Sequence, residues 1–175
     1  MDTIITTMAQ FLATIFTGKT LAVLGAGIAV LFAGIGSAKG VGMVSEAGTA
    51  LLAEDPSKFG KAMLLQALPA TQGIYGFVVA LLILFVSPGL FGSSVELSIE
   101  QGMYLFAACL PIAIGGWMSA VKQARVSAAG INMLAKRPDA VGKAIINSAL
   151  VEMYAILSFL VSMLLVLFYS SVFPA

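Results

Sequence analysis

One carboxylate, Glu152, stands in an apolar run that extends from residue 145 to residue 168. A charged side chain near the centre of a bilayer costs about 2.5–3.5 kcal/mol on insertion scales, so an acidic residue there indicates a functional site. The alternative is a structural carboxyl group that stays protonated or pairs with a lysine of another helix. The other polar residues of the run are Asn147, Ser148, Tyr154, Ser158 and Ser162.

A second group of polar residues lies in an earlier apolar stretch. Thr71 and Gln72 both precede Tyr75 by about one helical turn. Pro69 lacks an N–H group and clashes with the preceding turn, so it is expected to bend the helix beside them. Gln123, in a later apolar stretch, is expected to reach a similar depth. Helix–helix hydrogen bonding, at about 0.6 kcal/mol per bond, explains one such residue, whereas several residues converging with the intramembrane carboxylate favour an ion site.

The composition predicts an all-α membrane protein. Of the 175 residues, 60% are apolar and only 10% are charged, and the mean hydropathy is +1.05. Soluble domains carry about 25% charged residues. Each of four apolar stretches exceeds the roughly 20 residues needed to span a bilayer. These stretches cover residues 21–52, 62–86, 103–134 and 144–173.

Composition also excludes several functions. A net charge of +1 gives no electrostatic footprint for nucleic acid. The chain contains no histidine, which excludes histidine catalysis and argues against a zinc or haem site. The single cysteine, Cys109, cannot form an intrachain disulfide and is interpreted as a packing residue.

The distribution of basic residues predicts the topology. Eight of the nine lysines and arginines flank the first and third connections between the apolar stretches. The middle connection has no basic residue and carries Glu96 and Glu100. The positive-inside rule therefore predicts cytoplasmic loops at about residues 53–61 and 135–143, with both termini outside.

The chain contains an internal duplication with an offset of 82 residues. Pro56 corresponds to Pro138, and Lys61, within Gly-Lys-Ala, corresponds to Lys143 within the same tripeptide. A parallel repeat of this kind lets hairpins pack side by side and continue around a ring. Glu152 corresponds to Ala70, so the two hairpins share one carboxylate.

The duplication predicts four segments. Residues 1–19 form an N-terminal extension, which we expect to be retained and not cleaved as a signal peptide. Residues 20–86 form the first transmembrane hairpin, without a carboxylate, and residues 87–101 form the extracellular connection. Residues 102–175 form the second transmembrane hairpin, with the ion-binding Glu.

Small residues recur every four positions in the first and third apolar stretches. Such rows let helix backbones approach closely in lipid. We therefore expect these two helices to form the narrow inner wall of an assembly, with the bulkier second and fourth helices outside. The rows are Gly34–Ala38–Gly42, Gly36–Gly40 and Gly116–Ala120–Ala124–Ala128.

Residues 68–77, the duplicated hairpins and the sequence Val-Glu-Met-Tyr at 151–154 resemble the membrane-rotor proteolipid (K or c subunit) of V-type rotary ATPases. The resemblance covers about residues 33–168. It implies two tandem hairpins that assemble into a homo-oligomeric rotor ring, with one ion per copy on the helix-4 carboxylate. It implies a non-catalytic subunit, because other subunits of such an ATPase hydrolyse the ATP.

Within the family the sequence is most similar to the sodium-binding branch. The resemblance implies five oxygen ligands, which suit Na⁺ because they can replace its hydration shell. A proton needs only the carboxyl oxygen, and H⁺ remains the alternative ion. No organic cofactor is implied, and Tyr75 would hydrogen-bond Glu152 and close the site. The implied ligands are the Leu68 backbone carbonyl, the Thr71 hydroxyl, the Gln72 and Gln123 side-chain carbonyls and the Glu152 carboxylate.

The resemblance also implies partners. These are identical subunits in the ring, the lipid bilayer of the cell membrane, a stator subunit that supplies an arginine, and a central-shaft subunit that binds the cytoplasmic loops. Arg125 does not lie beside the fourth helix, so the arginine is expected from another chain. A bacterial plasma membrane is favoured, with an archaeal one as the alternative.

Two function classes compete with the rotor. A four-helix secondary transporter would also use one membrane carboxylate, but it is expected without a tandem duplication and with an aromatic substrate cavity. A structural proteolipid, such as a pore or junction component, would explain the glycines but not the set of Thr71, Gln72, Gln123 and Glu152.

Overall fold

The computed structural model describes residues 2–86, 90–91 and 96–174, and nearly all of them are helical. No strand occurs in this part of the chain. The principal helices are α1 (Asp2–Ile15), α2 (Gly18–Glu54), α3 (Phe59–Ala67), α4 (Thr71–Leu81), α5 (Ile99–Lys136), α6 (Val141–Leu167) and α7 (Tyr169–Val172). Short 3₁₀ turns cover Pro56–Lys58, Leu68–Ala70 and Pro138–Ala140, and a π-helical segment covers Leu82–Val86.

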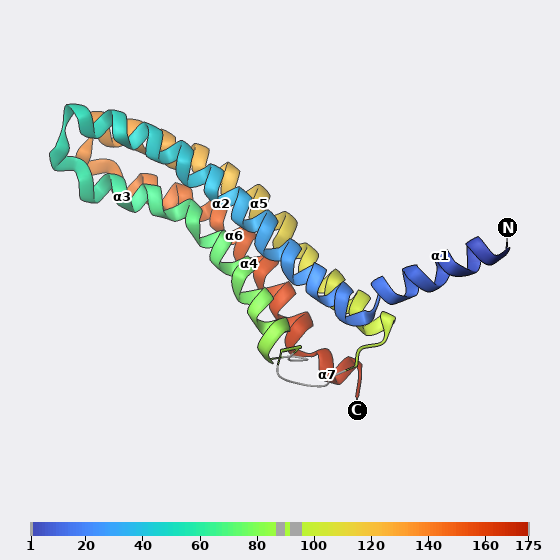
Figure 1. Ribbon diagram of the computed structural model, residues 1–175. Helices are drawn as coiled ribbons and strands as arrows, with labels where there is room; N and C mark the ends of the chain where they lie inside the picture. The colour runs from blue at the N-terminus through green and yellow to red at the C-terminus, as the bar shows by residue number, and fades with distance from the viewer. Residues whose placement is uncertain (1, 87–89, 92–95, 175) are drawn as a thin grey trace.

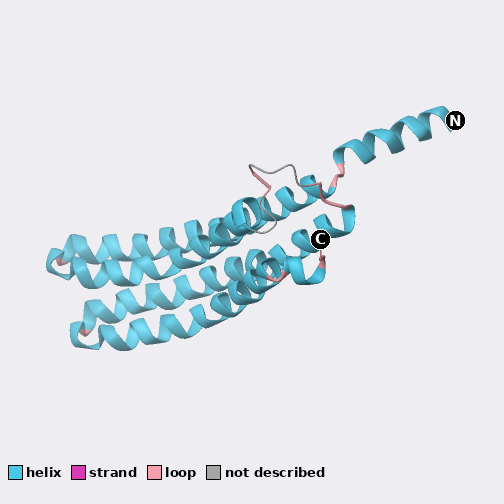
Figure 2. Ribbon diagram, turned by 90° about the horizontal axis from the view of Figure 1, so that it is seen from below, coloured by secondary structure: helices cyan, strands magenta, loops and turns pink. Residues whose placement is uncertain are grey.

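Four helical segments are long and apolar enough to cross a membrane, which confirms the four predicted spans. They form two hairpins that run side by side (Figure 1). The α2–α3 and α5–α6 turns lie at one end of the bundle, and α1 and the C-terminus lie at the other. Figure 2 shows the same elongated bundle from below, with α1 leaving it at the end opposite the turns.

Hydrogen-bonding caps set the beginnings of α2 and α5. Thr17 and Thr20 form a capping box before α2, and Ser98 and Gln101 form one before α5. Both helices consequently begin two or three residues before the predicted hairpins, which start at residues 20 and 102. Part of the expected connection 87–101, residues 87–89 and 92–95, lies outside the described residues.

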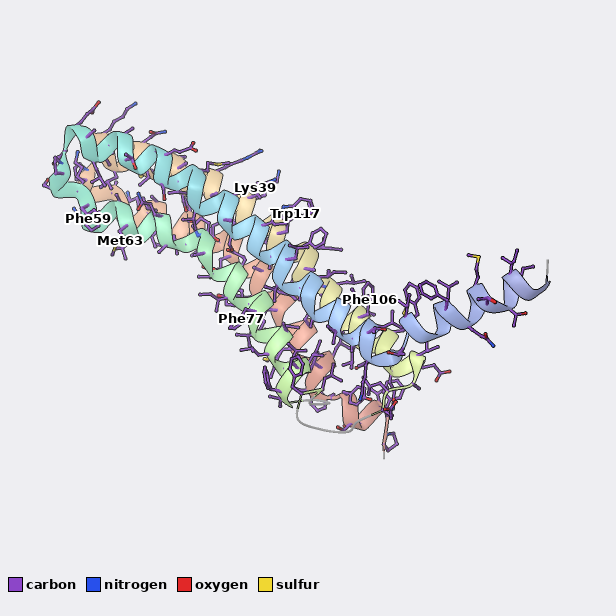
Figure 3. The ribbon with its side chains drawn as sticks, viewed as in Figure 1. Lys39, Phe59, Met63, Phe77, Phe106 and Trp117 are labelled. Carbon is purple, nitrogen blue, oxygen red and sulfur yellow. The ribbon has the colours of Figure 1, made fainter. Side chains whose placement is uncertain are left out.

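Close approach of two backbones holds α2 against α5. A Cβ atom added at Gly36 would lie 2.7 Å from the Trp117 Cα atom, and one added at Gly25 would lie 2.7 Å from the Phe106 Cα atom. Only glycine leaves enough room for such an approach. Figure 3 labels Trp117 and Phe106 on the α2–α5 side of the bundle, opposite Phe77 and Met63 of the α3–α4 side.

The two predicted rows of small residues on α2 have different roles. Gly36 and Gly40 are buried within the chain. Gly34 and Gly42 have no atom within 4 Å of an added Cβ, and Ala38 is exposed. The row Gly34–Ala38–Gly42 therefore remains available on the outside of the bundle.

Pro69 interrupts the second span, as predicted. The helix changes from α3 into the 3₁₀ turn Leu68–Ala70 and then into α4. Proline removes a backbone donor and disfavours the preceding α-helical turn, which explains the change of helix type. Its ring is buried against α2, where its Cβ would lie 2.8 Å from a Cβ added at Gly40.

The duplication is visible in the two turns. The residues that end α2 and α5, Asp55 and Arg137, have nearly identical dihedral angles of −140°/88° and −141°/84°. Lysines of the first turn also bond the second: the Lys58 ammonium donates to the Ala135 carbonyl at 3.1 Å, and the Lys61 ammonium donates to the Pro138 carbonyl at 3.0 Å. These bonds join the two hairpins at one end.

We predict that Gly36→Ala destabilises the chain by about 1–3 kcal/mol, because the added methyl group overlaps the backbone of α5. The measurement is thermal unfolding in detergent, followed by the reaction of a thiol-specific dye with the buried Cys109. Gly60→Ala is the matched control, because nothing lies within 4 Å of its added Cβ. Equal midpoints for the two variants would contradict the close-packing argument.

Candidate ion-binding site

The predicted site residues lie in a polar layer inside the bundle. One apolar cluster, which includes Ala29, Val79 and Ile112, fills the half nearer the termini. A second cluster, which includes Val44, Leu65 and Ile131, fills the half nearer the turns. Between them lie the buried polar residues Ser37, Gln72, Ser119, Gln123 and Ser148, and the buried Ser127 lies beside Ser148 at the edge of the second cluster.

Glu152 lies within this layer, on α6, and is partly buried. The Tyr75 hydroxyl donates to the Glu152 Oε1 atom at 2.9 Å. The Gln123 Nε2 atom donates to the Glu152 Oε2 atom at 3.4 Å. The carboxylate therefore accepts hydrogen bonds from α4 of the first hairpin and from α5 of the second hairpin, so it lies where the two hairpins meet.

The two glutamines form the innermost part of the site. Gln72 and Gln123 are both 0% exposed, and the Gln72 Nε2 atom donates to the Gln123 Oε1 atom at 2.5 Å. The Gln123 Nε2 atom also donates to the Ser148 carbonyl at 3.2 Å. Within the described residues the Gln72 Oε1 atom has no hydrogen-bond partner. A buried carbonyl oxygen without a donor is costly unless something binds it.

Thr71 and Leu68 form a separate pair at the Pro69 break. The Leu68 carbonyl accepts the Thr71 hydroxyl at 3.0 Å and also accepts the Thr71 backbone N–H. Both lone pairs of that carbonyl are thus in use, although a hydroxyl can rotate to another acceptor. The pair adjoins Gln72 in the chain, so all six predicted residues belong to one region of the bundle.

Two neighbours of the site were not predicted. The Ser148 carbonyl accepts from Gln123, and the Ser148 hydroxyl lies 2.6 Å from the Ser127 hydroxyl. The Phe159 ring stacks on Tyr75 with a centroid distance of 5.2 Å. Ser148 stands one helical turn before Glu152, which is a usable signal. No signal in the sequence distinguishes Phe159 from the other apolar residues of α6.

Ion pairs within the chain do not include Glu152 in the part that the structure describes. Ion pairs in the described part of the chain join Lys19 to Glu96 and Lys58 to Asp55. No lysine or arginine nitrogen of this part of the chain lies within 4 Å of the Glu152 carboxylate, so within one copy the carboxylate has only neutral hydrogen-bond donors. Nor do the described residues contain a cluster of three His, Cys, Asp or Glu side chains, the usual ligands of a transition metal. One carboxylate among neutral oxygens suits a proton or a hard monovalent cation.

Comparison with known proteins identifies the two hairpins. The model of the family described as the C subunit of ATP synthase matches residues 24–83 and again residues 106–165. These two segments repeat the offset of the internal duplication. Each contains one antiparallel pair of membrane-spanning helices.

Three relatives are similar to this chain. The V-type sodium ATPase subunit K of Enterococcus hirae is 50% identical over 160 residues, which cover 91% of this chain and 99% of the relative. The A-type ATP synthase subunit K of Methanocaldococcus jannaschii is 41% identical over 83% of this chain and 61% of the relative. The ATP synthase c subunit of Lachnoclostridium phytofermentans is 41% identical over 37% of this chain and 79% of the relative.

These matches confirm the resemblance inferred from the sequence. The Enterococcus relative aligns along nearly its whole length, and the family model recurs in both halves of the chain. The chain therefore belongs to the ATP synthase C-subunit family, with one family hairpin in each half and the intramembrane carboxylate in the second.

Proposed function

We propose that this chain is the rotor-ring subunit of the membrane sector of a V-type ATPase. It carries Na⁺ across the membrane on Glu152 while other subunits hydrolyse ATP. The family and the similarity to a V-type sodium ATPase subunit K support the rotor role. The observation that carries the choice of ion is the buried, unpartnered Gln72 Oε1 atom beside the Gln123–Glu152 pair.

The proposed ligands have oxygen lone pairs to offer. Among the residues that the structure describes, none donates a hydrogen bond to the Gln72 Oε1 atom. The Gln123 Oε1 atom accepts one hydrogen bond, from Gln72, and keeps a second lone pair. Ion binding would turn the Thr71 hydroxyl away from Leu68, so that both oxygens face the cation. Tyr75, already bonded to Glu152, would close the site.

The carboxylate supplies the exchange step. With Na⁺ bound, Glu152 is neutral overall and can face lipid, whereas the empty carboxylate there costs several kcal/mol. An arginine of the stator subunit would stabilise the empty carboxylate and make exchange with the aqueous channels obligatory. Arg125 is exposed on α5 and makes no ion pair with Glu152, so the arginine is assigned to another chain.

H⁺ is the alternative ion. A proton needs one carboxylate oxygen and a hydrogen-bond donor such as Tyr75, and both are present. It would leave the Gln72 Oε1 atom without a partner, which is unfavourable for a fully buried carbonyl. This observation favours Na⁺ over H⁺.

The internal duplication supports a ring of identical copies. In the first hairpin, Gly36 and Gly40 of α2 and Gln72 and Gly76 of α4 are buried. The corresponding positions of the second hairpin border an open groove of about 470 Å³. Within one chain, the second hairpin covers the equivalent surface of the first hairpin. The first hairpin of a second copy would cover this groove in the same way. The groove is lined by Gly115, Met118, Ser119, Lys122, Val151, Tyr154, Leu157 and Ser158.

The opposite face of the chain offers the matching surface. Within the chain, Gly36 contacts Trp117. In the duplication, Met118 is the equivalent of Gly36, and Ile35 is the equivalent of Trp117. The same contact between two copies would therefore join Met118 of one copy to Ile35 of the next, and these residues are 57% and 39% exposed. Ile35 lies beside the outward row Gly34–Ala38–Gly42, which has the open space that a neighbouring helix requires.

The turns at the end opposite the termini are the proposed shaft-binding surface and would lie in the cytoplasm, with both termini outside. Lys58 pairs with Asp55 at 3.3 Å. Hydrogen bonds from Ser57 and from Lys58 lower the pKa of Asp55 below its ordinary value. Lys61 and Arg137 are exposed, and this mixed charge suits a polar partner.

We predict that Glu152→Gln abolishes ATP-driven uptake of radioactive sodium by vesicles that contain the complete ATPase, because the neutral amide cannot exchange a cation. Uptake should fall to the level of empty vesicles while the ring still assembles. Glu100→Gln, in the first turn of α5, is the control and should transport normally. Normal uptake by the Glu152 variant would overturn the proposal.

We predict that a carbodiimide labels Glu152 near neutral pH and that NaCl, but not KCl, suppresses the labelling. In Gln72→Leu the sodium concentration needed for half protection should rise about tenfold, equivalent to about 1.4 kcal/mol, because one ligand is lost. Gln66→Leu, on α3 outside the site, should match the unmodified chain. If Na⁺ does not affect the labelling, the transported ion is H⁺ and the proposed role as a rotor subunit still stands.

We predict that Ile35→Cys combined with Met118→Cys, in a Cys109→Ser background, forms disulfides between copies upon oxidation. A non-reducing gel should show a ladder of multimers, because each copy joins the next. Met118→Cys with Ile74→Cys is the control, since Ile74 is more exposed than Ile35 (58% against 39%) but lies on α4. Monomers alone for the first pair would contradict the proposed arrangement of copies.

A further inference from the structure

The N-terminal helix α1 has no role in the ion site. It ends at Ile15, and the membrane-spanning helix α2 begins at Gly18 after the cap residue Thr17. It then leaves the bundle at an angle instead of extending α2 (Figure 1). Its 14 residues measure about 21 Å, which is too short to cross the hydrocarbon core of a bilayer.

The described side chains of α1 separate into two faces. The large apolar side chains are 44–69% exposed and recur at the spacing of a single helical face. Thr6, Thr7 and Gln10 lie at the intervening positions. A helix with this pattern buries its apolar side in the boundary between headgroups and acyl chains. The apolar residues are Ile4, Ile5, Met8, Phe11, Leu12 and Ile15.

The apolar surface continues from α1 into α2. Ile15 and Phe16 share a groove of about 440 Å³ with Val23 and Leu24, in the first turns of the membrane-spanning helix. Lys19 also lines this groove and pairs with Glu96 at 3.7 Å. Charged groups at this level mark the membrane–water boundary, so the end of α1 that joins α2 lies at the bilayer interface.

Charge identifies the kind of lipid. Residues 3–18 contain no acidic or basic side chain. Interfacial helices that select anionic lipids carry lysine or arginine on the polar face, and their binding depends on salt. The threonine and glutamine face of α1 is uncharged, so it gives no reason to expect a preference for anionic headgroups.

We propose that α1 is an interfacial helix that lies along the outer face of the membrane spanned by the bundle, with Met8 and its apolar neighbours in the lipid and Gln10 toward water. Its binding depends on apolar burial and not on lipid charge. The ligand is the lipid interface itself, and the helix fixes the level of each copy in the bilayer.

The test uses the full-length chain in a Cys109→Ser background, labelled with a fluorescent dye at Met8→Cys or at Gln10→Cys. The chain is reconstituted into phosphatidylcholine vesicles, with iodide on both sides as the aqueous quencher. A phospholipid with a nitroxide near its headgroup is the lipid quencher. We expect nitroxide to quench the Met8 label several-fold more strongly than the Gln10 label, and iodide to show the reverse order.

Two further arms sharpen the result. Leu12→Asp should expose the Met8 label to iodide, whereas Thr6→Asp, on the polar face, should leave it protected. Replacing half of the phosphatidylcholine by phosphatidylglycerol should not change the quenching. Access of iodide to the Met8 label would overturn the proposal, as would quenching by neither agent, which would mean that protein covers the face. Strong dependence on phosphatidylglycerol would also overturn it.

Discussion

A carboxylate inside a membrane cannot remain charged without partners, and the interior of this bundle is arranged around that constraint. Tyr75 and Gln123 donate to the two oxygens of Glu152 from different helices. Two apolar clusters lie on either side of the polar layer and separate it from the two ends of the bundle. Burial strengthens each of these polar interactions, and it makes the unpartnered Gln72 oxygen costly until a cation or another donor binds it.

The site depends on how closely α2 and α5 approach. Gly36 and Gly25 bring the backbones of α2 and α5 into contact, and Gly76 of α4 leaves room for the close approach of α2 at Ala29 and Ala33. Gln123 on α5 thereby comes within hydrogen-bond distance of Gln72 on α4 and of the Ser148 carbonyl on α6. Close packing in lipid gains van der Waals energy and has no hydrophobic driving force behind it, so small side chains are essential.

The two halves of the duplication contribute different residues to the one proposed ion site. The first hairpin contributes Thr71, Gln72 and Tyr75, and the second contributes Gln123 and Glu152. The position equivalent to Glu152 in the first hairpin is Ala70, whose side chain has no carboxylate. The two hairpins have thus become complementary, and each supplies a part of the site that the other lacks.

The sequence by itself determined the four spans, the duplication, the break at Pro69 and the residue types able to bind an ion. These follow from composition, helical periodicity and repeated residues, which are local properties of the chain. Only the tertiary structure decided that Gly36, and not Gly34, meets α5, that Phe159 stacks on Tyr75, and that Gln72 keeps an oxygen free. Periodicity defines the faces of a helix, but which face meets which neighbour depends on the packing of all four helices together.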